Sequence, residues 1–586
     1  MNAAPSQSLI NLLLESGVAS TEEAAQLTTN LNGGSWVSQV LDSGKVDEQR
    51  FLGAIGNFFR VPVVSIDAKN IDRTTLAMLP SRFVFQHHIL PIEAKENSVV
   101  LATYDLFNSI GRQLAGQLLK KPAEWVLVPR AQLLRAMKTL YGVGAETFDE
   151  ILKTRGSMDL LEDSEVAIEL NADDPEASVV KFVNQIIREA ILERATDIHV
   201  EPLENDLRIR YRIDGILHEV AVPPQLRVLQ SAIISRLKVM SRMDIDERRL
   251  PQDGRMTFIS RYVELDVRVS KIPTVNGESI SLRLLSRGEQ QFNFDRLDLG
   301  DRQEKIIRNL LTQPNGIILL TGPTGCGKST SLYCFLSSIN SVQRRIITIE
   351  EPVEYRIPGV SQIDVKPEID LTFAKGLRHI LRQDPNVVMV GEIRDVETAD
   401  ISIRAAMTGH LVFSTLHTND AVGGITRLLD MDVEPFLLAS VVKSFIAQRL
   451  VRTICPDCVE MVDYPRDYLA EISFPVKELG TRFRRGAGCD QCRHTGYQGR
   501  AAIYEVCVIT EPLRKLIMRR RDGSELKQCA VAEGMETLRQ DGWRRVSQGK
   551  TTIEEVVRVT QTDEVMAETT EAAEPVVATA ESAEIR

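Results

Sequence analysis

Residues 315–334 read NGIILLTGPTGCGKSTSLYC, an apolar run followed by a glycine-rich loop. The loop fits the pattern G-x-x-x-x-G-K-[ST], in which backbone N–H groups turn inward around a phosphate. A helix that begins near Lys328 would point its positive end at that charge, and Lys328 would add a cation for the β- and γ-phosphates. The run 317–320 supplies the strand that must precede such a loop, so a chance match is disfavoured. The sequence therefore predicts a nucleoside triphosphate site formed by Gly322, Pro323, Thr324, Gly325, Cys326, Gly327, Lys328, Ser329 and Thr330, with the Ser329 hydroxyl directed at Mg²⁺.

The overall composition is that of a soluble globular protein. The chain has 586 residues, of which 43% are hydrophobic and 26% charged. At about 150 residues per domain, this length suggests about four domains. Its net charge of −11 argues against nucleic acid as a main partner, because phosphate backbones need a basic face. No apolar stretch is long enough to span a bilayer, and no basic residue precedes the first apolar segment as in a signal peptide. We therefore expect a cytoplasmic protein without direct membrane insertion, whose eight cysteines form no disulfide framework.

Residues 300–560 alternate apolar strands with amphipathic helices around the phosphate loop. This alternation predicts an α/β fold with a parallel sheet and helices on both faces. Upstream, the patterns predict a helix at 179–193 and strands at 197–201, 207–213, 264–269 and 279–284, which together indicate a compact α+β domain. The first section has runs typical of buried strands at 99–102 and 125–128. It also has a weak repeat, because LLESG at 13–17 recurs as VLDSG at 40–44.

Composition sets the expected domain boundaries. The segment 143–176 turns acidic and loses its large apolar periodicity, which is typical of a linker. The residues after Thr560 are mainly Ala, Glu, Thr and Val without a pattern, and we expect them to be disordered. The predicted order is an N-terminal helical and α+β domain (1–142), an acidic linker (143–176), a second α+β domain (177–290), a nucleotide-binding domain (291–560) and an acidic tail (561–586).

Two apolar strands downstream of the loop end in acids. Residues 346–352, IITIEEP, deliver Glu350 to the carboxyl edge of the sheet, where doubly wound folds bind ligands. Residues 385–395, PNVVMVGEIRD, deliver Glu392 in the same way. Either acid would orient or deprotonate the attacking water, or bind Mg²⁺ through a water. The alternatives are a helix-capping acid at Glu350 and a simple pair between Arg394 and Asp395, and the sequence leaves the division of roles open.

A third segment, 405–420, contains two of the eight histidines on either side of a strand. Most isolated histidines are structural. His417, however, follows the carboxyl end of its strand, near Thr415 and Asn419, where an imidazole would sense a γ-phosphate. We therefore select His417 as the candidate and favour His410 less.

Four cysteines form two C-x-x-C pairs separated by thirty residues. They are Cys455, Cys458, Cys489 and Cys492, and such paired knuckles supply four thiolates for a structural Zn²⁺. The interval is long, so residues 450–500 should form a small subdomain. The alternative is four reduced thiols without metal. The remaining cysteines have no ligand spacing and are expected to be buried apolar residues; they are Cys326, Cys334, Cys507 and Cys529.

Arginines alternate along the strand at 207–213, so Arg208, Arg210 and Arg212 should project from one face. Arg255 follows the turn-forming sequence PQDG at 251–254, which would hold it at the tip of a loop. Solvated surface charge is the usual explanation for such residues. A row of arginines before a nucleotide site is nevertheless what an arginine-finger arrangement needs.

Taken together, the motifs resemble those of the assembly ATPases of type II secretion systems and type IV pili. The resemblance covers about residues 1–560. Besides the four cysteines, the matching segments are Gly322–Thr330, Glu350–Tyr355, Gly391–Asp395, Thr408–Asp420, Ala195–His199, Arg249–Arg255, Ile425–Leu428 and Gly496–Arg500.

The resemblance implies a RecA-like ATPase domain that carries the zinc subdomain and is preceded by a PAS-like α+β domain. It implies a homo-hexamer that uses ATP, Mg²⁺ and structural Zn²⁺, with Arg210, Arg212 and Arg255 closing over the phosphates. Hydrolysis would move one domain against another and act on an inner-membrane platform protein, with a membrane-anchored adaptor as a further partner. Type II secretion is the first hypothesis and pilus extension the second. Alternatives of other classes are a nucleotide-sensing module without turnover and, less favoured, a DNA-transport or helicase protein.

Three positions depart from the family pattern. Glu351 stands where Asp is more usual. Cys326 stands where relatives usually have Ser; we expect activity to survive and the thiol to be open to alkylating reagents. The N-terminal domain resembles a module that in some relatives binds cyclic di-GMP through Arg-Leu-Gly. Here those positions read SLI at 8–10 and SWV at 35–37, so we predict partner docking without tight cyclic di-GMP binding.

Overall fold

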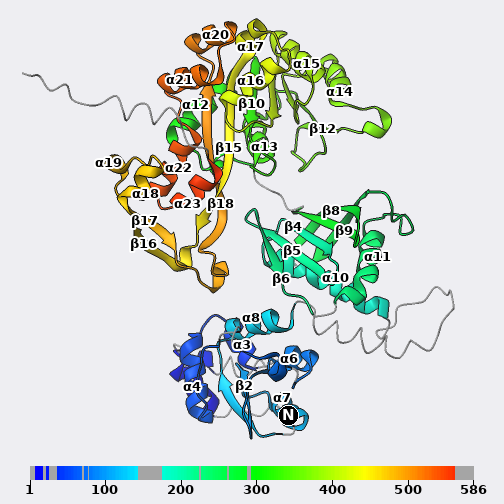
Figure 1. The fold of residues 1–586 in the computed structure, drawn as a ribbon, viewed down its shortest axis with the longest axis vertical. Coiled ribbons are helices and arrows are strands. Elements are labelled where there is room, and N and C mark those ends of the chain that lie inside the picture. The colour runs from blue at the N-terminus through cyan, green and yellow to red at the C-terminus, as the bar shows by residue number, and fades with distance from the viewer. Residues whose placement is uncertain are drawn as a thin grey trace, which may run out of the picture. The chain divides into compact units, whose positions relative to one another are not determined.

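The computed structural model describes residues 7–17, 22–24, 36–66, 68, 71–76, 78–119, 121–142, 175–223, 226–260, 263–286 and 292–560. The chain divides into two compact units, residues 1–288 and 289–586 (Figure 1), and each is described by itself. The expected linker up to residue 174 and the expected tail at 561–586 lie outside the described residues. In the part of the chain that the structure describes, no helix has the length and apolar character needed to cross a membrane.

The first part of unit 1 is a three-stranded sheet surrounded by helices. β1 and β2 are antiparallel, β2 and β3 are parallel, and the strands predicted at 99–102 and 125–128 fall in β2 and β3. The elements are α1 (Gln7–Glu15), α3 (Trp36–Asp42), α4 (Glu48–Phe59), α5 (Arg73–Leu76), α6 (Ser81–His87), β1 (Leu90–Ala94), β2 (Val99–Thr103), α7 (Ser109–Leu119), β3 (Ala123–Leu127) and α8 (Arg130–Tyr141).

The weak sequence repeat has a local structural cause, because each copy ends a helix. The hydroxyl of Ser16 donates to the carbonyl of Leu12 at 2.6 Å, and that of Ser43 donates to Val40 at 2.7 Å. The glycine that follows each serine has a positive φ, 92° in the first copy and 65° in the second, which favours glycine. The cyclic di-GMP prediction stays a prediction, since Ser35 lies outside the described residues.

The second part of unit 1 is a six-stranded antiparallel sheet in the order β6-β5-β4-β9-β8-β7, with a core formed together with α10 and α11. The sequence predicted β5 with the observed bounds, β4, β8 and β9 with shorter ones, and α10 with a start four residues late and an end one residue late, but not β6, β7 or α11. The elements are α10 (Pro175–Leu192), β4 (Asp197–Pro202), β5 (Leu207–Ile213), β6 (Ile216–Val220), α11 (Gln230–Met240), β7 (Gln252–Ser260), β8 (Val263–Thr274) and β9 (Gly277–Ser286).

Unit 2 contains the predicted doubly wound sheet, in the order β12-β11-β13-β14-β10-β15-β18. All neighbouring strands are parallel except β15 and β18, so the sheet ends in one antiparallel strand. The strands are β10 (Gly316–Thr321), β11 (Ile346–Glu350), β12 (Ser361–Asp364), β13 (Val387–Val390), β14 (Leu411–Leu416), β15 (Val442–Ile454) and β18 (Tyr497–Val508).

Helices cover both faces of this sheet, as expected from the sequence. Along β10, Ile317 and Leu319 enter a core with α15, α16 and α17, while Ile318 and Leu320 enter a core with α12 and α13. The helices are α12 (Asp301–Leu311), α13 (Lys328–Ile339), α14 (Phe373–Ile380), α15 (Val396–Met407), α16 (Val422–Asp430), α17 (Pro435–Val441), α20 (Glu511–Met518), α21 (Gly523–Ala532), α22 (Leu538–Ser547) and α23 (Ile553–Val559).

The cysteine subdomain is an insertion between two paired strands. β15 and β18 run together from the sheet to a small group of elements (yellow and orange in Figure 1). That group consists of β16 (Val459–Asp463), α18 (Arg466–Glu471), α19 (Val476–Leu479) and β17 (Arg482–Gly486), with β16 and β17 antiparallel. The hairpin therefore connects the subdomain directly to the main sheet.

Candidate nucleotide and metal sites

The phosphate loop joins β10 to α13, and α13 begins at Lys328 as predicted. Gly322, Gly325 and Gly327 all have positive φ, at 143°, 79° and 94°, so glycine is the residue that fits the turn without strain. The ammonium of Lys328 donates to the carbonyls of Gly322 at 2.6 Å and Pro323 at 3.1 Å, which places it across the loop. Burial lowers the pKa of Lys328, and the nearby Glu392 carboxylate acts in the opposite direction.

Two residues of the loop differ in exposure in a way that matters for chemistry. Ser329, the predicted magnesium ligand, is exposed at the start of α13. Cys326 is only 4% exposed, and burial raises the pKa of its thiol. A buried thiol that stays protonated is a poor nucleophile, so the structure argues against the expected ease of alkylation.

Glu350 lies at the end of β11 in an enclosed network. Its carboxylate accepts hydrogen bonds from the hydroxyl of Thr348 at 2.6 Å, the amide of Gln362 at 3.1 Å and the hydroxyl of Tyr333. Burial raises the pKa of Glu350, although these three donors act against the shift. A carboxylate with a raised pKa is a better proton acceptor than an exposed one. Tyr333, which lies on α13, was not identified from the sequence.

Glu392 follows β13 and lies in a different, charged setting. One carboxylate oxygen is 2.5 Å from the guanidinium of Arg394, and the other is 3.2 Å from Nε2 of His417. Arg394 also contacts Glu351 at 3.1 Å, which gives that second acid a partner. The alternative of an Arg394–Asp395 pair is wrong, because Asp395 instead accepts from the backbone N–H of Thr398 and caps α15.

The two histidines have different environments, and His417, the candidate favoured from the sequence, is the one that lies near Glu392. Nδ1 of His410 is 2.8 Å from the carbonyl of Ala405, so His410 closes the end of α15. His417 is half exposed, follows β14 and contacts Glu392 at the carboxyl edge of the sheet. Thr415 beside it donates to the carbonyl of Gly391 at 2.8 Å, which ties β14 to the loop that carries Glu392.

The four predicted zinc ligands come together. The Sγ atoms of Cys455, Cys458, Cys489 and Cys492 all lie within 4.8 Å of one another, and three of the Sγ–Sγ distances are 3.8 Å. A tetrahedral Zn²⁺ with bonds of about 2.3 Å requires edges of about 3.8 Å, so the cluster fits the ion. Backbone N–H groups of Cys489 and Gly496 donate to Cys492 Sγ and, against the effect of burial, lower its pKa to about 6. Of the other cysteines, Cys326, Cys334 and Cys507 are buried as expected, but Cys529 is only half-buried.

The arginines of unit 1 are placed in part as expected. Arg210 and Arg212 project from one face of β5, but each has an acid nearby: Arg210 contacts Glu201 at 2.5 Å and Arg212 is 3.8 Å from Asp197. The predicted loop-tip position of Arg255 is wrong, because β7 begins at Gln252 and Arg255 is an exposed residue within that strand, opposite Arg268. Pairing of β7 with β8 outweighs the local turn preference.

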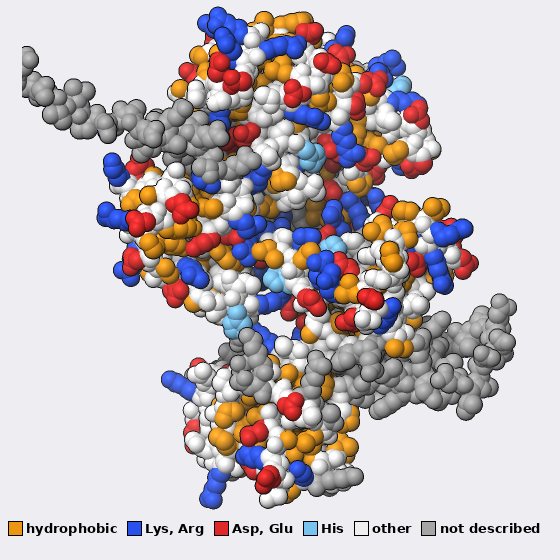
Figure 2. Space-filling view, viewed as in Figure 1, with side chains coloured by type: hydrophobic (Ala, Val, Ile, Leu, Met, Phe, Trp, Pro, Cys, Tyr) orange, Lys and Arg blue, Asp and Glu red, His pale blue; other side chains and the backbone are white. Residues whose placement is uncertain are grey.

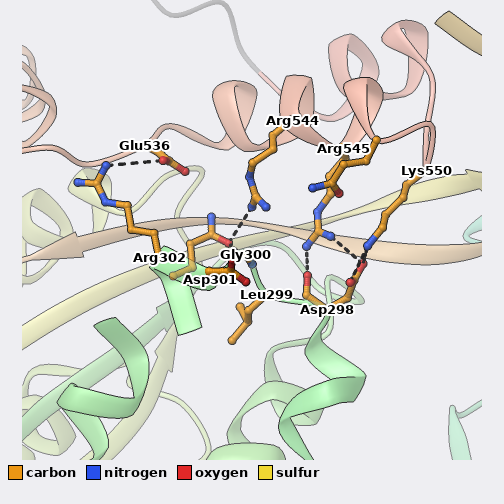
Figure 3. Close-up of a pocket in the computed structure, with 11 residues that line it drawn as sticks. Asp298, Leu299, Gly300, Asp301, Arg302, Glu536, Arg544, Arg545 and Lys550 are labelled. Atoms are coloured by element: carbon orange, nitrogen blue, oxygen red, sulfur yellow. Dashed lines mark hydrogen bonds and ion pairs between the residues drawn. The ribbon is translucent and has the colours of Figure 1, made fainter. Parts of the chain in front are cut away.

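A cavity of about 310 Å³ lies elsewhere in unit 2, at the start of α12 (Figure 3). Several basic side chains line it, but they contact neighbouring acids. Arg545 and Lys550 both contact Asp298, at 2.7 and 2.6 Å, and Arg302 lies 3.7 Å from Glu536. Figure 2 likewise shows basic and acidic side chains interspersed over the visible face of unit 2. The cavity lacks the phosphate loop and the two acids, so we do not assign it to the nucleotide.

A phosphate loop after β10, with acids after β11 and β13 and a histidine after β14, defines the class of P-loop nucleotide hydrolases. The chain belongs to the family described as Type II/IV secretion system protein, whose model matches residues 172–558, and it is an ATPase. A second model, the MshEN domain, matches residues 59–147.

Individual relatives agree with this assignment. The chain is 37% identical over 562 residues to the type IV pilus assembly ATPase PilB of Myxococcus xanthus, which covers 94% of this chain and 98% of the relative. It is 40% identical over 528 residues to the type II secretion system protein E of Xanthomonas campestris (88% and 92% covered) and 48% identical over 397 residues to that of Aeromonas hydrophila (67% and 78% covered). A crystal structure of the pilus retraction motor PilT with bound ADP is 28% identical, with a TM-score of 0.44 and 66% and 98% covered.

Proposed function

We propose that this ATPase powers a type II secretion system by coupling ATP hydrolysis to domain motion against an inner-membrane platform protein. The geometry that carries the proposal is the approach of His417 to Glu392 at the edge that also holds the phosphate loop. Support for the process comes from relatives named type II secretion system protein E, at 40–48% identity. The second candidate, pilus extension, is favoured by the long match to PilB.

The environments of the two acids suggest different roles. Glu350 is buried and has a raised pKa, so we assign it to orient and deprotonate the attacking water. Glu392 contacts Arg394 and His417, so we assign it to the charge balance around the phosphates. Mg²⁺, when bound, would neutralise charge on the β- and γ-phosphates, and the exposed Ser329 hydroxyl with Glu392 nearby offers the oxygen ligands it prefers. His417 would contact both the γ-phosphate and Glu392, so that the position of Glu392 depends on whether the γ-phosphate is present.

The remaining parts of the proposal concern assembly. We propose a homo-hexamer on the cytoplasmic side of the inner membrane, with the N-terminal domain (1–142) docking a membrane-anchored adaptor. Structural Zn²⁺ would hold the cysteine subdomain (450–500) together. Nucleotide phosphates in the ring would be contacted by Arg210, Arg212 and Arg255. Arg210 and Arg212 would then leave their acidic neighbours for the phosphates. No nucleic acid is required.

Steady-state ATP hydrolysis tests the enzyme assignment. Lys328→Ala and Glu392→Gln should each lower turnover by about 100-fold or more, because each removes a charge that acts on the phosphates. Glu525→Gln, an exposed acid on α21 that pairs with Arg521, is the matched control and should leave turnover unchanged. Turnover that survives both changes would favour the nucleotide-sensing alternative. A strain that lacks the gene, scored for exported proteins and for surface pili, separates secretion from pilus extension.

A further inference from the structure

Four strands of the unit 2 sheet align a row of residues at the level where β10 and β14 end. Leu416 pairs with Thr321, Thr321 pairs with Ala447, and Ala447 pairs with Glu505, so β14, β10, β15 and β18 contribute one residue each. The segment His417–Ala421, called here the His417 loop, leaves β14 at the first of these residues. Because β15 continues past Ala447 to Ile454, the loop has to pass the end of β10 and then cross β15 before it can reach Glu505 of β18.

Side chains from the three other strands each contact this loop. Thr321 of β10, the residue before the phosphate loop, donates its hydroxyl to the carbonyl of Asp420 at 3.1 Å. Arg449 of β15 donates to the carbonyl of Asn419 at 2.6 Å. Glu505 of β18 accepts from the backbone N–H of Ala421 at 2.8 Å. The loop is thus fixed at three successive residues by three successive strands.

Glu505 is an unusual residue for this position, because its side chain is only 1% exposed. Its second oxygen accepts from the N–H of Leu538 at 3.3 Å, so the carboxylate joins the N-terminal ends of α16 and α22. The positive ends of two helices offset part of the cost of burying a carboxylate. A simple apolar residue would avoid that cost but would leave the N–H of Ala421 without this acceptor.

Arg449 also lies close to the backbone of the phosphate loop. Gly322 has no room for a side chain, because a Cβ atom there would lie 3.1 Å from the Arg449 guanidinium and 2.6 Å from Cys326 Sγ. The same guanidinium donates to the carbonyl of Gln448, so Arg449 is held between Gly322 and the His417 loop. A shift of the phosphate loop at Gly322 would therefore displace Arg449, which donates to Asn419.

We propose that Arg449 and Glu505 are positioning residues that hold the His417 loop against the phosphate loop and so set the approach of His417 to Glu392. This inference rests on the proposed ATPase chemistry at His417 and Glu392. Because β15 and β18 are also the strands that carry the cysteine subdomain, displacement of that subdomain would reach His417 through these two side chains.

The test measures kcat and KM for ATP in Arg449→Gln, with and without His417→Ala. In the wild-type background, Arg449→Gln should lower kcat by about 10- to 100-fold and change KM for ATP much less, as expected for a misplaced group. In the His417→Ala background it should have no further effect, because Arg449 acts through His417. Arg449→Lys, which can still donate to Asn419, should restore part of kcat. Arg404→Gln, an exposed arginine of α15 that pairs with Asp400, is the matched control.

An equal loss of kcat in both backgrounds, or no loss in either, would overturn the inference. Glu505→Gln provides a second test, with the same expected dependence on His417, and Glu505→Asp replaces it if the glutamine variant does not fold. The proposed function and the positioning role can fail independently. If turnover does not depend on Lys328, the proposed function fails; if it depends on Lys328 but not on Arg449 or Glu505, only the positioning role fails.

Discussion

Cys326 shows how burial changes the chemistry expected of a residue. Its thiol is 4% exposed and packs against Gly322, and burial raises its pKa. We expect iodoacetamide at neutral pH to modify Cys326 at least about tenfold more slowly than Cys529, which is half-buried, since only the thiolate reacts. Mass spectrometry of tryptic peptides over time measures both rates. Equal rates would show that the phosphate loop opens in solution. Cys326→Ser should keep full ATPase activity, because a serine hydroxyl occupies the same small volume.

Tyr333 gives a second prediction for a single residue. Its hydroxyl donates to Glu350, and this hydrogen bond favours the ionised carboxylate. Tyr333→Phe removes the donor, so the pKa of Glu350 should rise further above its usual range. Because the proposed base must be ionised, the acid limb of the pH profile of kcat/KM should move to higher pH. The profile of Tyr468→Phe, a change within the cysteine subdomain, should coincide with that of the wild type.

The hairpin β15–β18 is the element on which the metal prediction depends. Its four thiolates have the mutual distances of a zinc tetrahedron, and their knuckles lie at the ends of both strands. We expect one zinc per chain by elemental analysis of the purified protein. Cys458→Ser should lower that content and the melting temperature, because the subdomain loses its cross-link. Cys529→Ser, outside the cluster, should leave both unchanged, and a zinc-free wild-type protein with an intact subdomain would contradict the prediction.

Some strands can be predicted from the sequence and others cannot. The buried parallel strands of unit 2 were predicted because both of their faces are apolar, as in the run 317–320. β7 was missed because PQDG at 251–254 is a turn sequence, whereas pairing with β8 extends the strand back to Gln252. Local preference is weaker than a ladder of nine residue pairs.

Some residues of the candidate site could also be predicted from the sequence, and others could not. Glu350, Glu392 and His417 were found because each ends or follows a strand at the same edge of the sheet. Thr321, Arg449 and Glu505 were missed because their roles depend on partners far away in the sequence: Glu505 and Ala421 are 84 residues apart. No local pattern marks such contacts, and only the order of strands in the sheet brings them together.

Across the whole molecule, hydrophobic cores indicate which parts fold without one another. Buried residues between Leu12 and Met137 form one core, those between Val179 and Leu282 form another, and neither shares a residue with the cores of unit 2. The family model begins at residue 172, and the Aeromonas hydrophila relative matches 67% of this chain. The N-terminal part should therefore serve docking and not hydrolysis.

A variant that begins at residue 172 tests this division. It should fold, with a melting transition close to that of the full chain, because the cores that it retains are complete. Its ATP turnover should stay within about threefold of the full chain under assembly conditions, since every group proposed to act on the nucleotide, the arginines of unit 1 included, lies after residue 172. In cells it should fail to restore export, because the proposed docking domain is missing. The full-length Lys328→Ala variant is the control with the opposite pattern, because it should keep the docking domain and lose ATP turnover. Loss of turnover in the shortened chain, with its fold intact, would instead show that the N-terminal part acts on hydrolysis itself.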